Sequence, residues 1–276
     1  MLPRKRILFP ADPKAKEKLM IANRTRSLSL AFLPGAFLVA FLCVQPLHAA
    51  AGCSNASLTG KYGFVVNGSS SHGAFAALGQ IATDGTGNIA GTVTSSDNGT
   101  INDGVEVLGN YKIDAHCTGT MTIQPAGLPK MSFTIGVTAD GSQISMVRTD
   151  NGTTELGTAQ AQASHRCSTS GVKGIYTLQG SGAQPGVGPL AIAGEVALRG
   201  AGTLKGAATI SVDGSIAKGQ KISGGFKVIR GCTGAAVIDI GNQGPIHLEL
   251  VAVSGERGVL FIQIDDNTVL AGSLRQ

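Results

Sequence analysis

The sequence predicts an all-β protein made of two tandem small antiparallel β-barrels, with about eight strands in each. Three observations carry this prediction: a domain-length internal repeat, a glycine-rich composition with few aromatics, and four cysteines at equivalent positions of the repeat. Glycine weakens helix interiors but suits tight turns, so 40 glycines in 276 residues favour short strands over helices.

The repeat is clearest where residues 109–119 return as residues 224–234. Both segments contain glycine, an aromatic residue, lysine and a β-branched residue, followed by Cys-Thr-Gly, at an offset of 115 residues. A repeat of this length is a whole domain rather than one unit of a solenoid. We therefore divide the chain into a leader (1–51), a first barrel domain (52–162) and a second barrel domain (163–276).

The leader has the features of a secretory signal peptide. It holds eight of the 22 basic residues, then an apolar run from Leu28 to Val44 and small residues before Cys53. Translation from Met20 would give a leader of ordinary length. Cleavage would release a secreted or periplasmic bacterial protein. The alternative is a retained signal anchor, and the membrane would then be contacted only through the leader.

The charge of the remaining chain gives no support to nucleic-acid binding. Residues 52–276 carry 14 basic and 15 acidic side chains, so the basic character belongs to the leader. The sequence does not indicate an oligomeric state.

Four cysteines occupy matching places in the two copies. In an exported chain this arrangement predicts the disulfides Cys53–Cys117 and Cys167–Cys232. Each would close a loop of about 65 residues and stabilise a domain that has few large side chains to bury.

Turn residues divide the first copy into eight predicted strands. Asp-Gly and Asn-Gly pairs mark several of the connections, and strands of about seven residues with short antiparallel links suit a closed barrel. The predicted strands are 59–67, 74–83, 88–96, 105–113, 117–123, 131–138, 142–149 and 153–160.

Two other all-β architectures share some of these features. A pair of immunoglobulin-like sandwiches has a similar cysteine separation, but the chain has no Trp to pack on the disulfide, and Tyr111 stands six residues before Cys117. We keep the sandwich pair as the alternative. A single outer-membrane barrel would need aromatic girdles that the sequence lacks.

The repeated motifs resemble bacterial secreted proteins with an allene oxide cyclase barrel-like domain. They are Gly-x-Tyr near the start of each copy, Asp-Gly-x-Gly at residues 84–87, and the segment from Gly109 to Thr120 that includes Cys-Thr-Gly-Thr. The resemblance spans both copies and implies small calycin-type barrels with a cavity. No motif of the plant cyclase's catalytic residues maps onto this chain, so none is carried over.

The strongest polar pair for chemistry is His247 and Glu249. They lie two residues apart on a predicted strand and so share one face of it. An inward pair would form an acid and a base within a lumen. At an offset of 115, however, Leu248 and Leu250 align with Phe133 and Ile135 of an apolar stripe, which predicts that His247 and Glu249 face outward.

The other histidines have no evident role in the sequence. His72 has no acidic partner near it in the chain, His116 adjoins a predicted disulfide, and His165 lies in the linker, so each is expected to be solvated. The loop at residues 84–88 is rich in side chains that could bind calcium through oxygen. The second copy keeps the glycines of this loop and loses its acid, which indicates a hairpin turn rather than a calcium-binding loop. We predict no catalytic, cofactor-binding or metal-binding residue.

Three function classes fit these features. The favoured one is an exported, non-catalytic binding or accessory protein that holds a small apolar ligand in a barrel lumen, where Ala77, Ile81, Val93 and Val107 are inward candidates. The second is a barrel cyclase or isomerase acting on an apolar substrate. The third is a structural or adhesive protein of the cell envelope.

Overall fold

The computed structural model describes residues 52–162, 166–241 and 243–276. The predicted leader, with its alternative start and its signal-anchor alternative, lies outside the described residues, as does His165. No helix within the described part of the chain is long and apolar enough to span a membrane.

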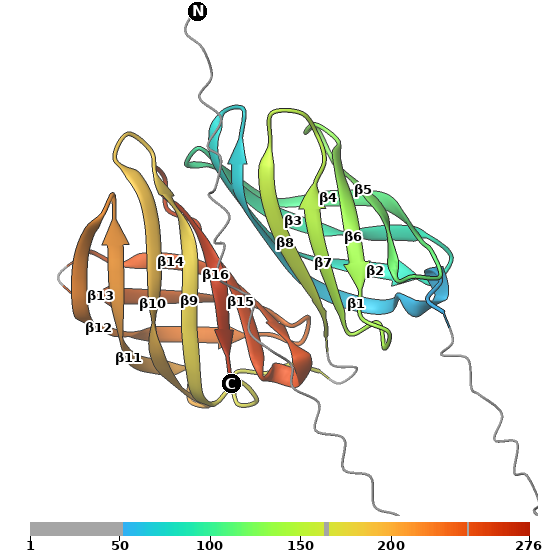
Figure 1. The fold of residues 1–276 in the computed structure, drawn as a ribbon. Helices are drawn as coiled ribbons and strands as arrows, with labels where there is room; N and C mark the ends of the chain where they lie inside the picture. The colour runs from blue at the N-terminus through green and yellow to red at the C-terminus, as the bar shows by residue number, and fades with distance from the viewer. Residues whose placement is uncertain (1–51, 163–165, 242) are drawn as a thin grey trace, which may run out of the picture. The chain divides into compact units, whose positions relative to one another are not determined.

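The first copy folds as a closed barrel of eight antiparallel strands, as predicted, and a short 3-10 turn (η1, Asn55–Ser57) precedes it (Figure 1). Each strand pairs with the next along the chain, and β8 closes the barrel on β1. The strands are β1 (Thr59–Ser70), β2 (Gly73–Asp84), β3 (Asn88–Asp97), β4 (Thr100–Ile113), β5 (Thr118–Pro125), β6 (Met131–Val137), β7 (Gln143–Arg148) and β8 (Thr154–Ala161).

The second copy is also a closed eight-stranded antiparallel barrel, in which β16 returns to β9 (Figure 1). A second 3-10 turn (η2, Ser254–Glu256) joins β14 to β15. The strands are β9 (Gly174–Gln184), β10 (Gly188–Arg199), β11 (Thr203–Val212), β12 (Ser215–Val228), β13 (Thr233–Ile240), β14 (Ile246–Val253), β15 (Gly258–Gln263) and β16 (Val269–Arg275). The sandwich alternative is therefore wrong.

One disulfide lies in each barrel, and both have the predicted pairing. Cys53 is bonded to Cys117, and Cys167 to Cys232, with a Cα–Cα distance of 4.9 Å in each. Cys117 and Cys232 both have positive φ, 62° and 64°. This left-handed backbone ends the preceding hairpin turn, so β5 starts at Thr118, one residue later than predicted.

Each barrel fills its interior with the alternate residues of its strands. In barrel 1 (β1–β8) the inward candidates Ala77, Ile81, Val93 and Val107 all belong to the buried core, as predicted. The first tyrosine of each copy crosses to a turn at the same end: the Tyr62 hydroxyl donates to Gly141 O, and the Tyr176 hydroxyl to Glu256 O, each at 2.8 Å.

A third apolar cluster joins outward-facing residues of the two copies. Leu78 of barrel 1 packs in one cluster with Leu260 and Ile262 of barrel 2 (β9–β16), and none is more than 1% exposed. Side-chain amides add hydrogen bonds between the barrels, among them those from Gln80 Nε2 to Gly231 O (2.6 Å) and from Gln162 Nε2 to Ala252 O (3.0 Å). Each barrel therefore covers part of the other's outer surface.

Candidate functional site

The interiors of the two barrels differ in polarity. Barrel 2 encloses a cavity of about 60 Å³ whose lining is entirely apolar and includes Phe226, Leu248, Phe261 and Leu270. This volume has room for only a few water-sized groups. Barrel 1 instead opens at one end into a cavity of about 200 Å³ that is lined by both apolar and charged residues. We call this cavity the mouth of barrel 1.

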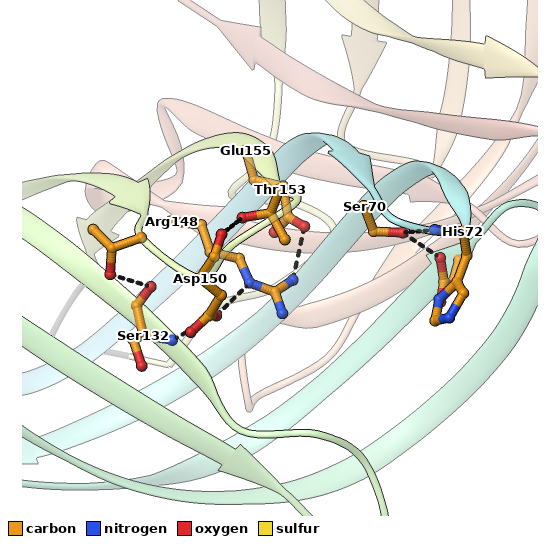
Figure 2. Close-up of polar contacts among 9 residues, drawn as sticks. Ser70, His72, Ser132, Arg148, Asp150, Thr153 and Glu155 are labelled. Atoms are coloured by element: carbon orange, nitrogen blue, oxygen red, sulfur yellow. Dashed lines mark hydrogen bonds and ion pairs between the residues drawn. The ribbon is translucent and has the colours of Figure 1, made fainter. Parts of the chain in front are cut away.

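Arg148, the last residue of β7, is the central charged group of the mouth. Its Nε donates to Asp150 Oδ2 and its Nη1 donates to Glu155 Oε1, both at 2.7 Å (Figure 2). The guanidinium carbon lies 5.9 Å from the centre of the Phe75 ring, which is within the range of a cation–π contact. The Arg148 side chain is only 11% exposed, so these partners hold it in one orientation.

Glu155 reaches this site because of the alternation along β8. Ala159, on the same face of the strand, lies in the barrel core, whereas Leu156 faces outward and is exposed. The Glu155 side chain is completely buried, and its Oε2 has no hydrogen-bond partner among the described residues. Burial raises the pKa of Glu155, and the opposing attraction of Arg148 does not cancel this effect.

Asp150 ties the mouth to the neighbouring strand. Its Oδ2 also accepts a hydrogen bond from the backbone N–H of Ser132 at 3.0 Å, and its carbonyl oxygen accepts one from the Thr153 hydroxyl at 2.7 Å (Figure 2). Desolvation acts to raise the pKa of Asp150, but the hydrogen bonds and charge of Arg148 and the Ser132 N–H outweigh it, so the pKa is lowered.

His72 lies on the rim of the mouth with an acidic partner that the sequence did not reveal. The expectation that no acid accompanies it is wrong: His72 Nδ1 is 2.9 Å from Asp97 Oδ2. The Ser70 hydroxyl donates to the other oxygen of Asp97 at 3.0 Å. It also accepts a hydrogen bond from the His72 backbone N–H (Figure 2). The pairing of β2 with β3 brings Asp97 back beside the β1–β2 turn.

The walls of the mouth are largely apolar. Phe75 and Val93 line it from β2 and β3, and Pro129 and Met131 line it from the β5–β6 connection and the start of β6. Ser95 and Asn102 add neutral polar groups. The mouth thus combines an apolar wall with several hydrogen-bond acceptors, the arrangement expected of a small-molecule site.

Barrel 2 shows which of these groups the architecture itself requires. At the offset of 115, Asp150 corresponds to Asp265, which accepts hydrogen bonds from the backbone N–H of His247 (2.9 Å) and from Gln263 Nε2 (3.1 Å). Gln263 stands where barrel 1 has Arg148, and Leu270 stands where it has Glu155. The aspartate is therefore common to both barrels, while the ion pair belongs to barrel 1 alone.

The predicted polar pair His247 and Glu249 lies on the outer face of β14, with Leu248 and Leu250 in the core between and beside them. The structure does not bring the two together. His247 Nδ1 is 2.7 Å from Asp265 Oδ1. Glu249 instead lines a groove with Thr94 of barrel 1. Desolvation, with the nearby Asp103 carboxylate, raises the pKa of Glu249.

The remaining sequence candidates have local roles. Asp84 Oδ1 accepts hydrogen bonds from the backbone N–H groups of Thr86, Gly87 and Asn88, so its carboxylate stabilises the β2–β3 turn. The backbone N–H of exposed His116 donates to Asp114 in another turn. In the described part of the chain, no three His, Cys, Asp or Glu side chains are grouped so as to hold a metal ion.

Arg148 and Glu155 were missed at the sequence level although a signal for them existed. Ile144, Met146 and Arg148 alternate along β7, so the arginine falls on the same inward face as two core residues. Glu155 stands in the same relation to Gly157 and Ala159 on β8. The period of two along each strand places both charged residues on the inward face.

Fold and site together define a class: a disulfide-bonded protein of two tandem closed eight-stranded antiparallel barrels, with a charged mouth in the first barrel only. Neither a comparison with protein-family models nor a search of curated proteins finds a match to this chain.

Proposed function

We propose that the protein is an exported binding protein that holds a small molecule at the mouth of barrel 1. The single observation that carries the proposal is the difference between the two copies. Barrel 2 builds the same fold with Gln263 and Leu270, so the buried Arg148–Glu155 pair is not needed to form a barrel. A buried ion pair is weak support for stability, which leaves ligand binding as its best explanation.

The cavity sizes assign different roles to the barrels. Both volumes are below the roughly 300–1,000 Å³ of typical ligand pockets, but the 200 Å³ of the mouth suit a fragment-sized ligand, whereas barrel 2 offers only 60 Å³. Barrel 2 is therefore proposed as the structural copy. This moves the expected apolar ligand from a lumen to the mouth of barrel 1, where the ligand meets Arg148, Asp150 and Asp97.

The proposal also includes the protein family and the cellular compartment of the protein. Two disulfides are typical of an oxidising, extracytoplasmic environment. With the sequence features of the leader, they support export to the periplasm or the medium. The two closed barrels with cystines at the predicted positions support kinship with the allene oxide cyclase barrel-like secreted proteins.

The test is retention of small molecules by the purified protein. The protein is incubated with a mixed extract of bacterial small molecules, passed through a desalting column and denatured, and the released compounds are identified by mass spectrometry. The control is the double substitution Arg148→Gln with Glu155→Leu, which gives barrel 1 the residues of barrel 2. Compounds retained by the wild type and not by this variant support the proposal. Equal retention by both, or none by either, contradicts it.

A further inference from the structure

We infer that the mouth of barrel 1 selects a ligand that carries a protonated amine beside an apolar ring or chain. This inference rests on the proposed function and adds the chemical class of the ligand. It is carried by the balance of charge at the mouth, by carboxylates that remain partly exposed there, and by the apolar side chains beside the charged groups.

The charge at the mouth is negative. Asp97 and Asp150 line the cavity, and among the described residues Arg148 is the only guanidinium or ammonium group that does so. His72 also lines the cavity and contacts Asp97. Glu155 does not line the cavity but pairs with Arg148. Two carboxylates already share the positive charge of Arg148. An anionic ligand would therefore meet net repulsion, whereas a cation would be attracted.

The carboxylates that remain exposed at the mouth are hydrogen-bond acceptors, so they favour a ligand that donates hydrogen bonds. The Asp97 and Asp150 side chains are about one-third exposed, 31% and 30%, so they can still accept from a molecule in the cavity. An ammonium group supplies three donors and a positive charge.

The apolar side chains of the mouth favour an apolar body for the rest of the ligand. Phe75, Val93 and Met131 line the cavity near the charged groups. A ligand with an apolar body attached directly to its amine would bury that body against these side chains while its charge stays near the carboxylates.

The experiment compares three probes with the same frame by isothermal titration calorimetry: 2-phenylethylamine, 2-phenylethanol and phenylacetate. We expect the wild-type protein to bind the amine at least about tenfold more tightly than the alcohol, and phenylacetate most weakly, as expected when one charged contact separates the probes. Added salt should weaken binding of the amine more than that of the alcohol.

Three variants test which carboxylates produce the preference for the amine over the alcohol. Asp97→Asn and Glu155→Gln should each reduce the ratio of amine to alcohol affinity several-fold. Glu106→Gln, which removes an exposed carboxylate of β4 that does not line the mouth, should leave the ratio unchanged. Should a mouth variant fail to fold, the amine-to-alcohol ratio and the salt dependence of the wild type still decide the question.

The outcomes separate the two claims. Alcohol binding as tight as amine binding, or tighter binding of phenylacetate, overturns the amine inference and leaves the proposed binding function in place. Absence of binding by all three probes counts against both.

Discussion

At the residue scale, the Arg148–Glu155 pair is the main difference between the copies. Removing one member of a buried ion pair typically costs about 3–5 kcal/mol, because the remaining charge is left unpaired, whereas replacing both members by well-packed apolar groups is often neutral. The duplication has already made a related replacement, with Gln263 and Leu270 in the corresponding positions. The pair therefore adds charge to barrel 1 without being a requirement of the fold.

The pKa of Glu155 leads to a prediction about pH. Burial raises this pKa above its ordinary value of 4.5, so the folded state holds the proton more tightly than the unfolded state. As the pH rises from 4.5 towards the raised folded-state pKa, the contribution of Glu155 to the free energy of unfolding must fall, and above that pKa it stays constant. Below 4.5 the favourable contribution is fully present.

We therefore expect the free energy of unfolding of the wild type, relative to Glu155→Gln, to decrease with rising pH over this window. Urea denaturation of both proteins from about pH 4 to pH 8 measures it. Asp150 has a lowered pKa and acts in the opposite sense at lower pH, where stability is lost as its carboxylate is protonated, but it is present in both proteins. A difference that is flat or rises with pH would show that Glu155 is not destabilised by burial.

At the scale of elements, both barrels are held by the same two devices. A disulfide joins the segment before the first strand to the turn after the fourth, and a tyrosine hydroxyl of the first strand binds the turn after the sixth. These devices connect parts of the chain that lie 64 to 80 residues apart. They are the same in both copies, and this marks them as structural.

Removal of one disulfide should lower stability substantially. The cystines span 64 and 65 residues, and a loop of that length corresponds to about 4 kcal/mol in the chain-entropy description. We expect the double substitution Cys53→Ala with Cys117→Ala to lower the urea midpoint accordingly, and the equivalent change at Cys167 and Cys232 to have a similar effect. Non-reducing peptide mapping checks the pairing. An unchanged midpoint in either variant would mean that the cystine does not stabilise its barrel.

At the scale of the whole molecule, some side chains on the outer faces of the barrels are also buried. Every residue of β15 is buried, although one face of this strand points into barrel 2 and the other points outward. The inward face, with Val259 and Phe261, belongs to the core of barrel 2, while Leu260 and Ile262 pack in the cluster shared with barrel 1. The two barrels are thus coupled by apolar packing as well as by the chain.

We expect Ile262→Asp to uncouple the barrels, because a buried carboxylate without a partner opposes the shared cluster. Differential scanning calorimetry should then show two transitions in place of one cooperative transition. Val147→Asp is the matched control, since Val147 is 52% exposed on the outside of β7 and should change little. One transition with an unchanged midpoint in the Ile262 variant would contradict the coupling.

Sequence patterns alone were enough to predict the duplication, the cystine pairing and the outward face of His247 and Glu249. These depend on local rules: turn residues end strands, and alternation with a period of two assigns each side chain to a face, as Leu248 and Leu250 did for His247 and Glu249. Which faces meet depends on the packing of strands that are distant in the sequence. The pairing of β2 with β3 placed Asp97 beside His72, the β7–β8 hairpin paired Arg148 with Glu155, and contact between the barrels buried Ile262. Each of these depends on distances between strands that no local pattern contains.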